Sequence, residues 1–182
     1  MKTFNYTGED IKKRLIEGNQ RSLSSKSVTI NTSEETHKAA LQGQKPYAAV
    51  IACSDSRVIP EAIFSAGIGE LFVVRVAGNV IDKFQLGSIE YAVEHLGVSF
   101  ILVLGHDHCG AVHSALHHEN NGYTKYITDE ILKAAGGEKD EMKACKLNTE
   151  NSCRVIENSL QNDNITVAGA LYHLESGSIE FL

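Results

Sequence analysis

The sequence lacks tryptophan and has only two prolines and four cysteines among 182 residues. Four widely spaced cysteines are too few for the disulfide scaffold of a small secreted domain. Basic residues are also scarce: 17 stand against 23 acidic residues, which gives a net charge of −6. An acidic chain without a block of Lys and Arg is a poor candidate for binding nucleic acid or an anionic membrane.

Long apolar segments are missing as well. No run approaches the roughly 18 apolar residues of a membrane span, and residues 1–6 contain no apolar signal core. What is present is the composition of a globular protein, with 42% hydrophobic residues. We therefore expect one soluble domain in a reducing compartment, the cytoplasm, with no membrane or nucleic-acid partner.

Four short apolar runs indicate the fold class. They are continuous rather than alternating, which is typical of strands buried on both faces of a parallel sheet; they cover residues 47–52, 71–76, 99–104 and 165–172. Helical patterns lie between them, at residues 60–66, 85–96, 109–118 and 150–161. This alternation predicts an α/β domain with a central, mostly parallel sheet flanked by helices. A hairpin turning at Glu175–Ser178 is expected to add an antiparallel C-terminal edge strand.

An N-terminal helical arm precedes this core. Residues 8–22 read as an amphipathic helix, and Ser33 begins a capping pattern for a short helix that ends near Gly43. Because this part has no strong core pattern of its own, we expect residues 1–43 to pack on a partner subunit. Residues 44–182 then form a single α/β core.

Unusual residues follow two of the predicted strands. The first strand runs into CSDSR at 53–57, and the third into GHDHCG at 105–110. Sites in open α/β sheets form at the carboxyl ends of the strands, so Cys53, His106 and Cys109 are expected to be neighbours. Two thiolates and an imidazole suit Zn²⁺, and three protein ligands leave the fourth tetrahedral position open, as in catalytic sites.

Other interpretations of these cysteines stay open at this point. Each could be a small apolar core residue, or Cys53 and Cys109 could form a redox pair, although no CxxC motif is present. A structural zinc site would need a fourth ligand, which Cys145, Cys153 or another histidine could supply.

Charged residues and histidines surround the predicted ligands. Asp55 and Arg57 are either a loop cap and a surface residue, or an ion pair that keeps a carboxylate ionised beside the metal. His113 and His117 lie four apart on one helix face, and we expect both to be exposed. His108 is a weaker candidate for a proton relay.

The two motifs together resemble the β-class carbonic anhydrases. The similarity extends over most of the chain, through the segments Gln44–Pro46, Phe72–Arg75, Ala77–Asn79, Ser88–Val93, Gly169–Tyr172 and Glu180–Leu182. From this resemblance we expect a zinc enzyme that catalyses the reversible hydration of carbon dioxide to bicarbonate and a proton by zinc-bound hydroxide. The resemblance implies one Zn²⁺ per chain on Cys53, His106 and Cys109, with Asp55 and Arg57 as the catalytic dyad.

The resemblance also implies a substrate pocket and an assembly. Gln44 would donate a hydrogen bond to the substrate, Phe72 and Tyr91 would line the apolar CO₂ pocket, and Gly110 would lie beside the metal. The family's pocket forms at a dimer interface, so a homodimer or a dimer of dimers (a homotetramer) is expected. Two alternatives share the motifs: a hydrolase of carbonyl sulfide or carbon disulfide, and a non-catalytic zinc-binding or redox-sensing protein.

Departures from the family pattern refine these expectations. A bicarbonate-inhibited subclass carries Trp three residues before the first Cys ligand and Gly directly before it, where this chain has Val50 and Ala52. The missing tryptophan therefore favours the subclass whose site stays open, with Asp55 paired to Arg57. Asp107, often Ser or Thr in the family, is expected to cap the following helix. Val76 and Ala77 also differ from the family's usual Asn and larger aliphatic residue.

Overall fold

The computed structural model describes residues 6–25, 30, 32–119 and 121–182; residues 1–5, 26–29 and 31 of the expected arm lie outside this range. Five strands form one sheet in the order β2-β1-β3-β4-β5. Their bounds are β1 Ala48–Ala52, β2 Leu71–Arg75, β3 Phe100–His106, β4 Thr166–Tyr172 and β5 Ile179–Phe181. The first four strands pair in parallel, and β5 pairs antiparallel to β4. The predicted α/β fold with an antiparallel edge strand is confirmed.

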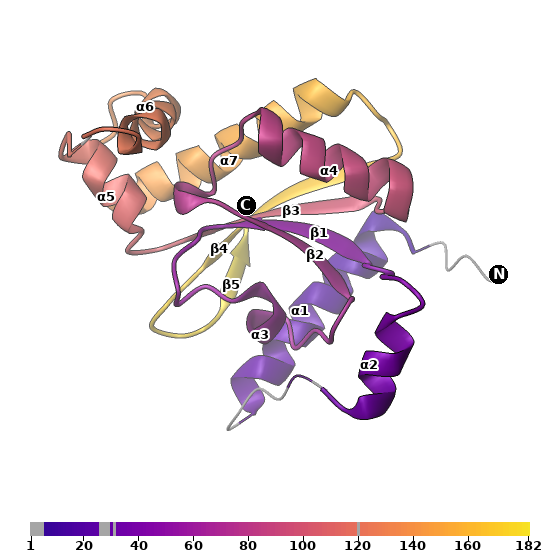
Figure 1. The fold of residues 1–182 in the computed structure, drawn as a ribbon. Helices are drawn as coiled ribbons and strands as arrows, with labels where there is room; N and C mark the ends of the chain where they lie inside the picture. Colours follow the sequence, from indigo (N-terminus) through magenta and orange to yellow (C-terminus); the bar gives the residue numbers. More distant parts are fainter. Residues whose placement is uncertain (1–5, 26–29, 31, 120) are drawn as a thin grey trace.

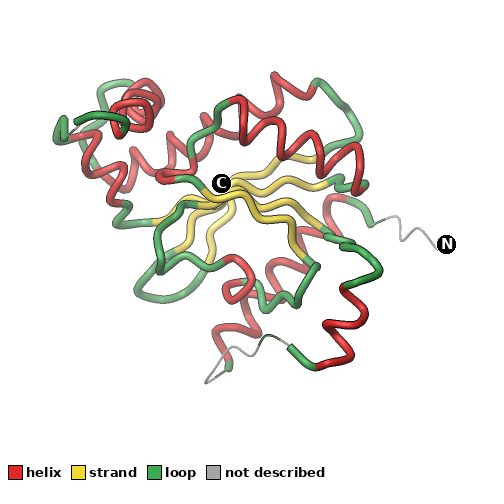
Figure 2. The backbone as a smooth tube through the Cα atoms, in the orientation of Figure 1, coloured by secondary structure: helices red, strands yellow, loops and turns green. Residues whose placement is uncertain are grey.

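Helices surround the sheet, as the tube in Figure 2 shows. Their bounds are α1 Gly8–Ser24, α2 Glu34–Ala40, α3 Pro60–Ile63, α4 Lys83–Leu96, α5 Gly110–Leu116, α6 Thr124–Ala135 and α7 Glu141–Leu160, with a 3₁₀ turn, η1, at Ala77–Asn79. In the part of the chain that the structure describes, no helix is long and apolar enough to cross a bilayer.

The central strands owe their position to their apolar sequence. Every residue of β1 and β3 is buried, because helices cover both faces of the sheet (Figure 1). On one face, Ile11 and Leu15 of α1 pack with Phe64 after α3. On the other face, Ile89 of α4 and Ile156 of α7 pack together. Because helices cover both faces of the sheet, the loops at the strand ends are where the sheet can present reactive groups.

Helix α1 packs on the core of its own chain. A capping box between Thr7 and Asp10 starts the helix. The Asn19 side chain is buried and donates hydrogen bonds to the carbonyl oxygens of Ile63 and Gly177. Helix α2 buries none of its residues. The packing of residues 1–43 on a partner subunit stays a prediction.

Helices α5 and α6 and the N-terminal end of α7 gather beyond the carboxyl ends of the parallel strands (Figure 1). Val112, Ile131 and Ala144, one from each helix, share a buried cluster with Cys53 and Cys109. The sequence pattern did not predict α6, and it placed the start of α7 at residue 150 rather than at Glu141. The middle of α7 buries polar residues, so the buried face of this helix does not appear as an apolar pattern in the sequence. These residues are Asn148, Thr149 and Ser152.

Candidate metal centre

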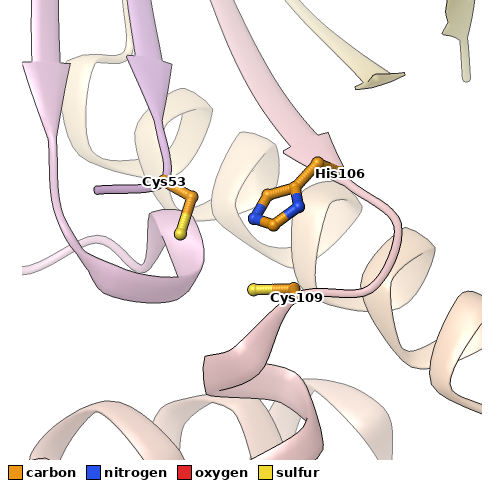
Figure 3. A group of neighbouring side chains, drawn as sticks. All are labelled: Cys53, His106 and Cys109. Carbon is orange, nitrogen blue, oxygen red and sulfur yellow. The ribbon is translucent and has the colours of Figure 1, made fainter. Parts of the chain in front are cut away.

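The structure brings the three predicted ligands together. Cys53 directly follows β1, His106 is the last residue of β3, and Cys109 precedes α5. Because β1 and β3 are parallel neighbours, their carboxyl ends place these side chains at the same edge. One ligand atom from each residue lies within 4.8 Å of the other two, and all three residues are buried. Figure 3 shows their side chains converging on a common space.

His106 is oriented as a metal ligand. Its Nδ1 lies 2.7 Å from the backbone oxygen of Asp107, which can only accept, so Nδ1 carries the hydrogen. The lone pair of the neutral ring is then on Nε2. This atom is buried and has no hydrogen-bond partner among the described residues. Buried polar atoms are almost always satisfied, and an Nε2 held this way beside two thiols fits a metal ion that completes its coordination.

The two thiols favour one shared proton in the absence of a metal. A hydrogen bond from the Cys109 thiol lowers the pKa of Cys53 to about 4, and the backbone N–H groups of Asp55 and Gly78 add to this effect. They lie 3.4 Å and 3.2 Å from Cys53 Sγ. The same hydrogen bond and burial raise the pKa of Cys109 far above its ordinary value. A dication is needed to hold both sulfurs as thiolates, and two thiolates with one imidazole are a donor set for Zn²⁺.

The turn η1 behind Cys53 is held by helix α7. Asn148 Nδ2 donates to the Gly78 oxygen at 2.7 Å, and Ser152 Oγ donates to the Asn79 oxygen at 3.0 Å. Gly78 has a φ of 68°, and a Cβ there would come within 2.8 Å of Ile131 Cδ1. The positive φ favours glycine at this position, and a larger side chain would also have to displace the Ile131 side chain. The buried polar face of α7 therefore fixes the N–H group that faces the Cys53 sulfur.

Asp55 and Arg57 form a bidentate ion pair at the mouth of the group. Arg57 Nε and Nη2 donate to Asp55 Oδ1 and Oδ2 at 2.9 Å and 2.7 Å, and the Arg57 backbone N–H also donates to Oδ1. The guanidinium holds the pKa of the Asp55 carboxyl well below its usual range. A second arginine fixes the loop, because Arg75 donates to the backbone oxygens of Cys53 and Asp55 at 3.1 Å and 2.6 Å.

Comparison with known proteins identifies the family of this chain. The family model described as carbonic anhydrase matches residues 48–179. The chain belongs to the carbonic anhydrase family. A carbonic anhydrase of Mycolicibacterium smegmatis is 37% identical, with 92% of this chain and 90% of that protein covered. Carbonic anhydrase 2 of Mycobacterium tuberculosis is 46% identical over 68% of this chain, which spans 60% of that relative's length.

Solved structures identify the β class of carbonic anhydrases. The β-carbonic anhydrase CafA of Aspergillus fumigatus superposes with a TM-score of 0.73 at 26% identity, over 81% of this chain and 80% of that one. A Coccomyxa β-carbonic anhydrase, solved in complex with acetazolamide, gives 0.67 at 30% identity, over 82% and 78% of the two chains. The resemblance drawn from the two motifs is thereby confirmed.

Asp107, one of the departures from the carbonic anhydrase pattern, does not cap the following helix. Helix α5 has Cys109 at its N-cap, without a side-chain capping bond. The Asp107 carboxylate instead accepts a hydrogen bond from the Leu174 backbone N–H at 2.9 Å and lies 3.3 Å from His173 Nδ1. The expectation was wrong because the partner lies 67 positions away in the C-terminal hairpin, where no local pattern reveals it.

The predicted substrate residues divide into two groups. Gly110 is exposed at the start of α5, next to Cys109. Gln44 precedes β1, so the whole strand separates it from Cys53 at the other end. Phe72 and Tyr91 lie together, with ring centroids 6.2 Å apart, on the outer strand β2 and on α4. Tyr91 is 48% exposed. Within one chain, Gln44 and this aromatic pair are therefore not assembled around the metal group.

Sequence reasoning missed two kinds of residue at this site. Arg75 carries a detectable signal, because it is a charged residue that ends an otherwise apolar strand run. Asn148 and Ser152 carry none, since their partners lie 70 and 73 positions earlier in the chain. The exposed positions of His113 and His117 were expected and are confirmed. His108 is exposed, and its carbonyl oxygen accepts from Arg57 at 3.1 Å.

Proposed function

We propose that this carbonic anhydrase homologue catalyses the zinc-dependent, reversible hydration of carbon dioxide to bicarbonate and a proton. One observation carries the proposal: a buried Cys53–His106–Cys109 group, with the unsatisfied Nε2 of His106, opens beside an ion-paired carboxylate. A purely structural site would have no use for that carboxylate. When bound, zinc supplies a strong positive charge that makes water acidic near neutral pH.

Asp55 acts in this proposal by accepting a hydrogen bond from the reacting water. Arg57 keeps the carboxylate ionised, so it can accept but not donate. Oδ1 receives two hydrogen bonds from Arg57, whereas Oδ2 receives one. Oδ2 thus retains acceptor capacity on the side away from the guanidinium. Accepting a hydrogen bond from the water fixes the direction in which the oxygen lone pair faces the substrate.

The apolar half of the site comes, in this proposal, from a second copy of the chain. Gln44, Phe72 and Tyr91 lie away from the metal group of their own chain and near the outer strand β2. Tyr91 is exposed and Phe72 is half-buried, and an exposed aromatic side chain beside a sheet edge is typical of a surface that another chain covers. We propose a homodimer, or a dimer of dimers, in which these residues line the partner's pocket. Structures of two Sordaria macrospora relatives are described as tetrameric.

Subunit mixing tests the shared site. Cys53→Ala removes the metal site of one chain, and Gln44→Ala damages the pocket that this chain lends to its partner. A mixed dimer of the two variants contains one complete site, so activity after unfolding and refolding together should exceed the mean of the separate variants. Activity equal to that mean would show that each site is built within one chain.

Stopped-flow measurement of CO₂ hydration with a pH indicator tests the reaction itself. The zinc-loaded protein should be active, and Cys53→Ala should lose bound zinc and activity together. Cys153→Ala is the matched control, because Cys153 lies on α7 outside the site and should leave both unchanged. Sulfide release from carbonyl sulfide or carbon disulfide without CO₂ hydration would favour the hydrolase. Stoichiometric zinc with neither reaction would favour a non-catalytic protein.

The paired thiols also bear on location. Cys53 and Cys109 must stay reduced to serve as ligands, and all four cysteines are free thiols. Thiols persist in reducing compartments, which supports our proposal of a cytoplasmic enzyme.

A further inference from the structure

A second group of potential metal ligands lies on the surface. It consists of His113 and His117 on the α5 side and Glu141 in the first turn of α7. A ring nitrogen of each histidine and a carboxylate oxygen of Glu141 lie within 4.8 Å of one another. We propose that the two histidines of this group, with Glu141 orienting the His113 ring, form a second, weaker site for a transition-metal dication such as Zn²⁺, separate from the Cys53–His106–Cys109 group.

The hydrogen bonds of the two histidines leave the correct nitrogen free. His113 Nδ1 lies 2.7 Å from Glu141 Oε1, and His117 Nδ1 lies 2.9 Å from the His113 backbone oxygen. An ionised carboxylate and a carbonyl can only accept, so both Nδ1 atoms carry hydrogen. Each neutral ring then has its lone pair on Nε2. Metal-binding histidines generally have their other nitrogen satisfied in this way by a carboxylate or a backbone oxygen.

The two rings are already side by side. Their four-residue spacing places them on one face of the helix, and the rings stack with centroids 4.1 Å apart and an interplanar angle of 28°. The two side chains therefore lose little conformational entropy when a metal ion binds to both rings. Imidazole is a good ligand for zinc, copper and nickel. Because the site is exposed, water completes the coordination and keeps the affinity below that of the buried group.

Glu141 links this site to the body of the protein. It is a positioning residue here, since its carboxylate orients the His113 ring and adds negative charge beside the ion. The first turn of a helix stabilises such a carboxylate. Helix α5 begins directly after the predicted zinc ligand Cys109, and the His113–Glu141 hydrogen bond joins this helix to α7.

Zinc titration of the enzyme that already holds one zinc per chain tests this site, with tag-free protein and isothermal calorimetry. Wild type should bind a second equivalent of Zn²⁺, and the double variant His113→Ala/His117→Ala should not. Glu141→Ala should bind it about tenfold more weakly, as expected for the loss of an orienting partner. His37→Ala, which removes a lone exposed histidine on α2, should behave as wild type.

Thermal unfolding gives a second readout that does not depend on activity. A ligand that binds only the folded state raises the melting temperature, so excess Zn²⁺ should raise that of wild type and not that of the double variant. The proposal is overturned if wild type binds only one equivalent. It is also overturned if the double variant retains the second equivalent at wild-type affinity. Neither result bears on CO₂ hydration, which is measured separately.

Discussion

The substitution Asn148→Ala probes how helix α7 supports the metal centre. Asn148 is 2% exposed, and its side chain donates to the Gly78 oxygen at 2.7 Å. Removing the donor leaves a buried carbonyl oxygen without this partner, which costs about 1–3 kcal/mol. That is a sizeable share of the roughly 5–15 kcal/mol by which a domain of this kind is stable.

Zinc affinity should fall as well as stability. The Gly78 N–H lies 3.2 Å from Cys53 Sγ, and it keeps this position because Asn148 holds the other side of the same residue. Outer partners of metal ligands typically contribute about 10–100-fold in affinity. We therefore expect Asn148→Ala to weaken zinc binding by about tenfold, at the lower end of that range, because Cys53 keeps the Asp55 N–H.

Two assays separate these effects. Urea unfolding of the metal-free protein measures the free energy of unfolding, and competition with a chromophoric chelator measures zinc affinity. Ser159→Ala is the matched control, because its hydroxyl is exposed and donates to the Val155 oxygen of the same helix. It should change the free energy of unfolding by less than about 0.5 kcal/mol. If Asn148→Ala matches this control in both assays, α7 does not position the Cys53 loop.

Two further substitutions test the packing and the charge of the site. Gly105→Ala in β3 would drive a methyl group into the Thr149 hydroxyl, so we expect the free energy of unfolding to fall by about 1–3 kcal/mol. The double variant Gly105→Ala/Thr149→Ala should recover part of this loss. A double variant no more stable than Gly105→Ala alone would contradict the clash. Asp55 has a pKa below its unfolded value of about 3.9, so its contribution is present above about pH 4 and is lost at lower pH. In metal-free protein, wild type should be more stable than Asp55→Asn by on the order of 1 kcal/mol at pH 6, a small value because Arg57 is half exposed. This difference in unfolding free energy should shrink as the pH falls to 3. A difference independent of pH would contradict the ion pair.

The buried strands and the metal group were predictable from sequence because their signals are local. Continuous apolar runs reveal strands that are buried on both faces, and the observed bounds of β1 and β2 differ from the predicted ones by one residue. The carboxyl ends of neighbouring parallel strands lie at the same edge, so Cys53 and His106 come close because β1 and β3 are neighbours in the sheet.

Long-range polar contacts account for what the sequence did not reveal. Asn148 and Ser152 look like surface residues in a polar stretch, yet both are buried against a turn 70 or more positions earlier. Asp107 looks like a local helix cap and instead bonds to the C-terminal hairpin. The separation of Gln44 from Cys53 appears only once strand direction is known, because the two are nine positions apart and β1 lies between them.

The zinc K-edge absorption spectrum of the protein at one zinc per chain and neutral pH tests the central claim most directly. Two sulfur ligands at about 2.3 Å and one imidazole nitrogen at about 2.0–2.1 Å are expected, with a light atom in the fourth position. The double variant His113→Ala/His117→Ala should give the same spectrum, because the first equivalent belongs to the buried group. A spectrum with three or four sulfur ligands, or one without sulfur, would contradict a zinc site built from Cys53, His106 and Cys109.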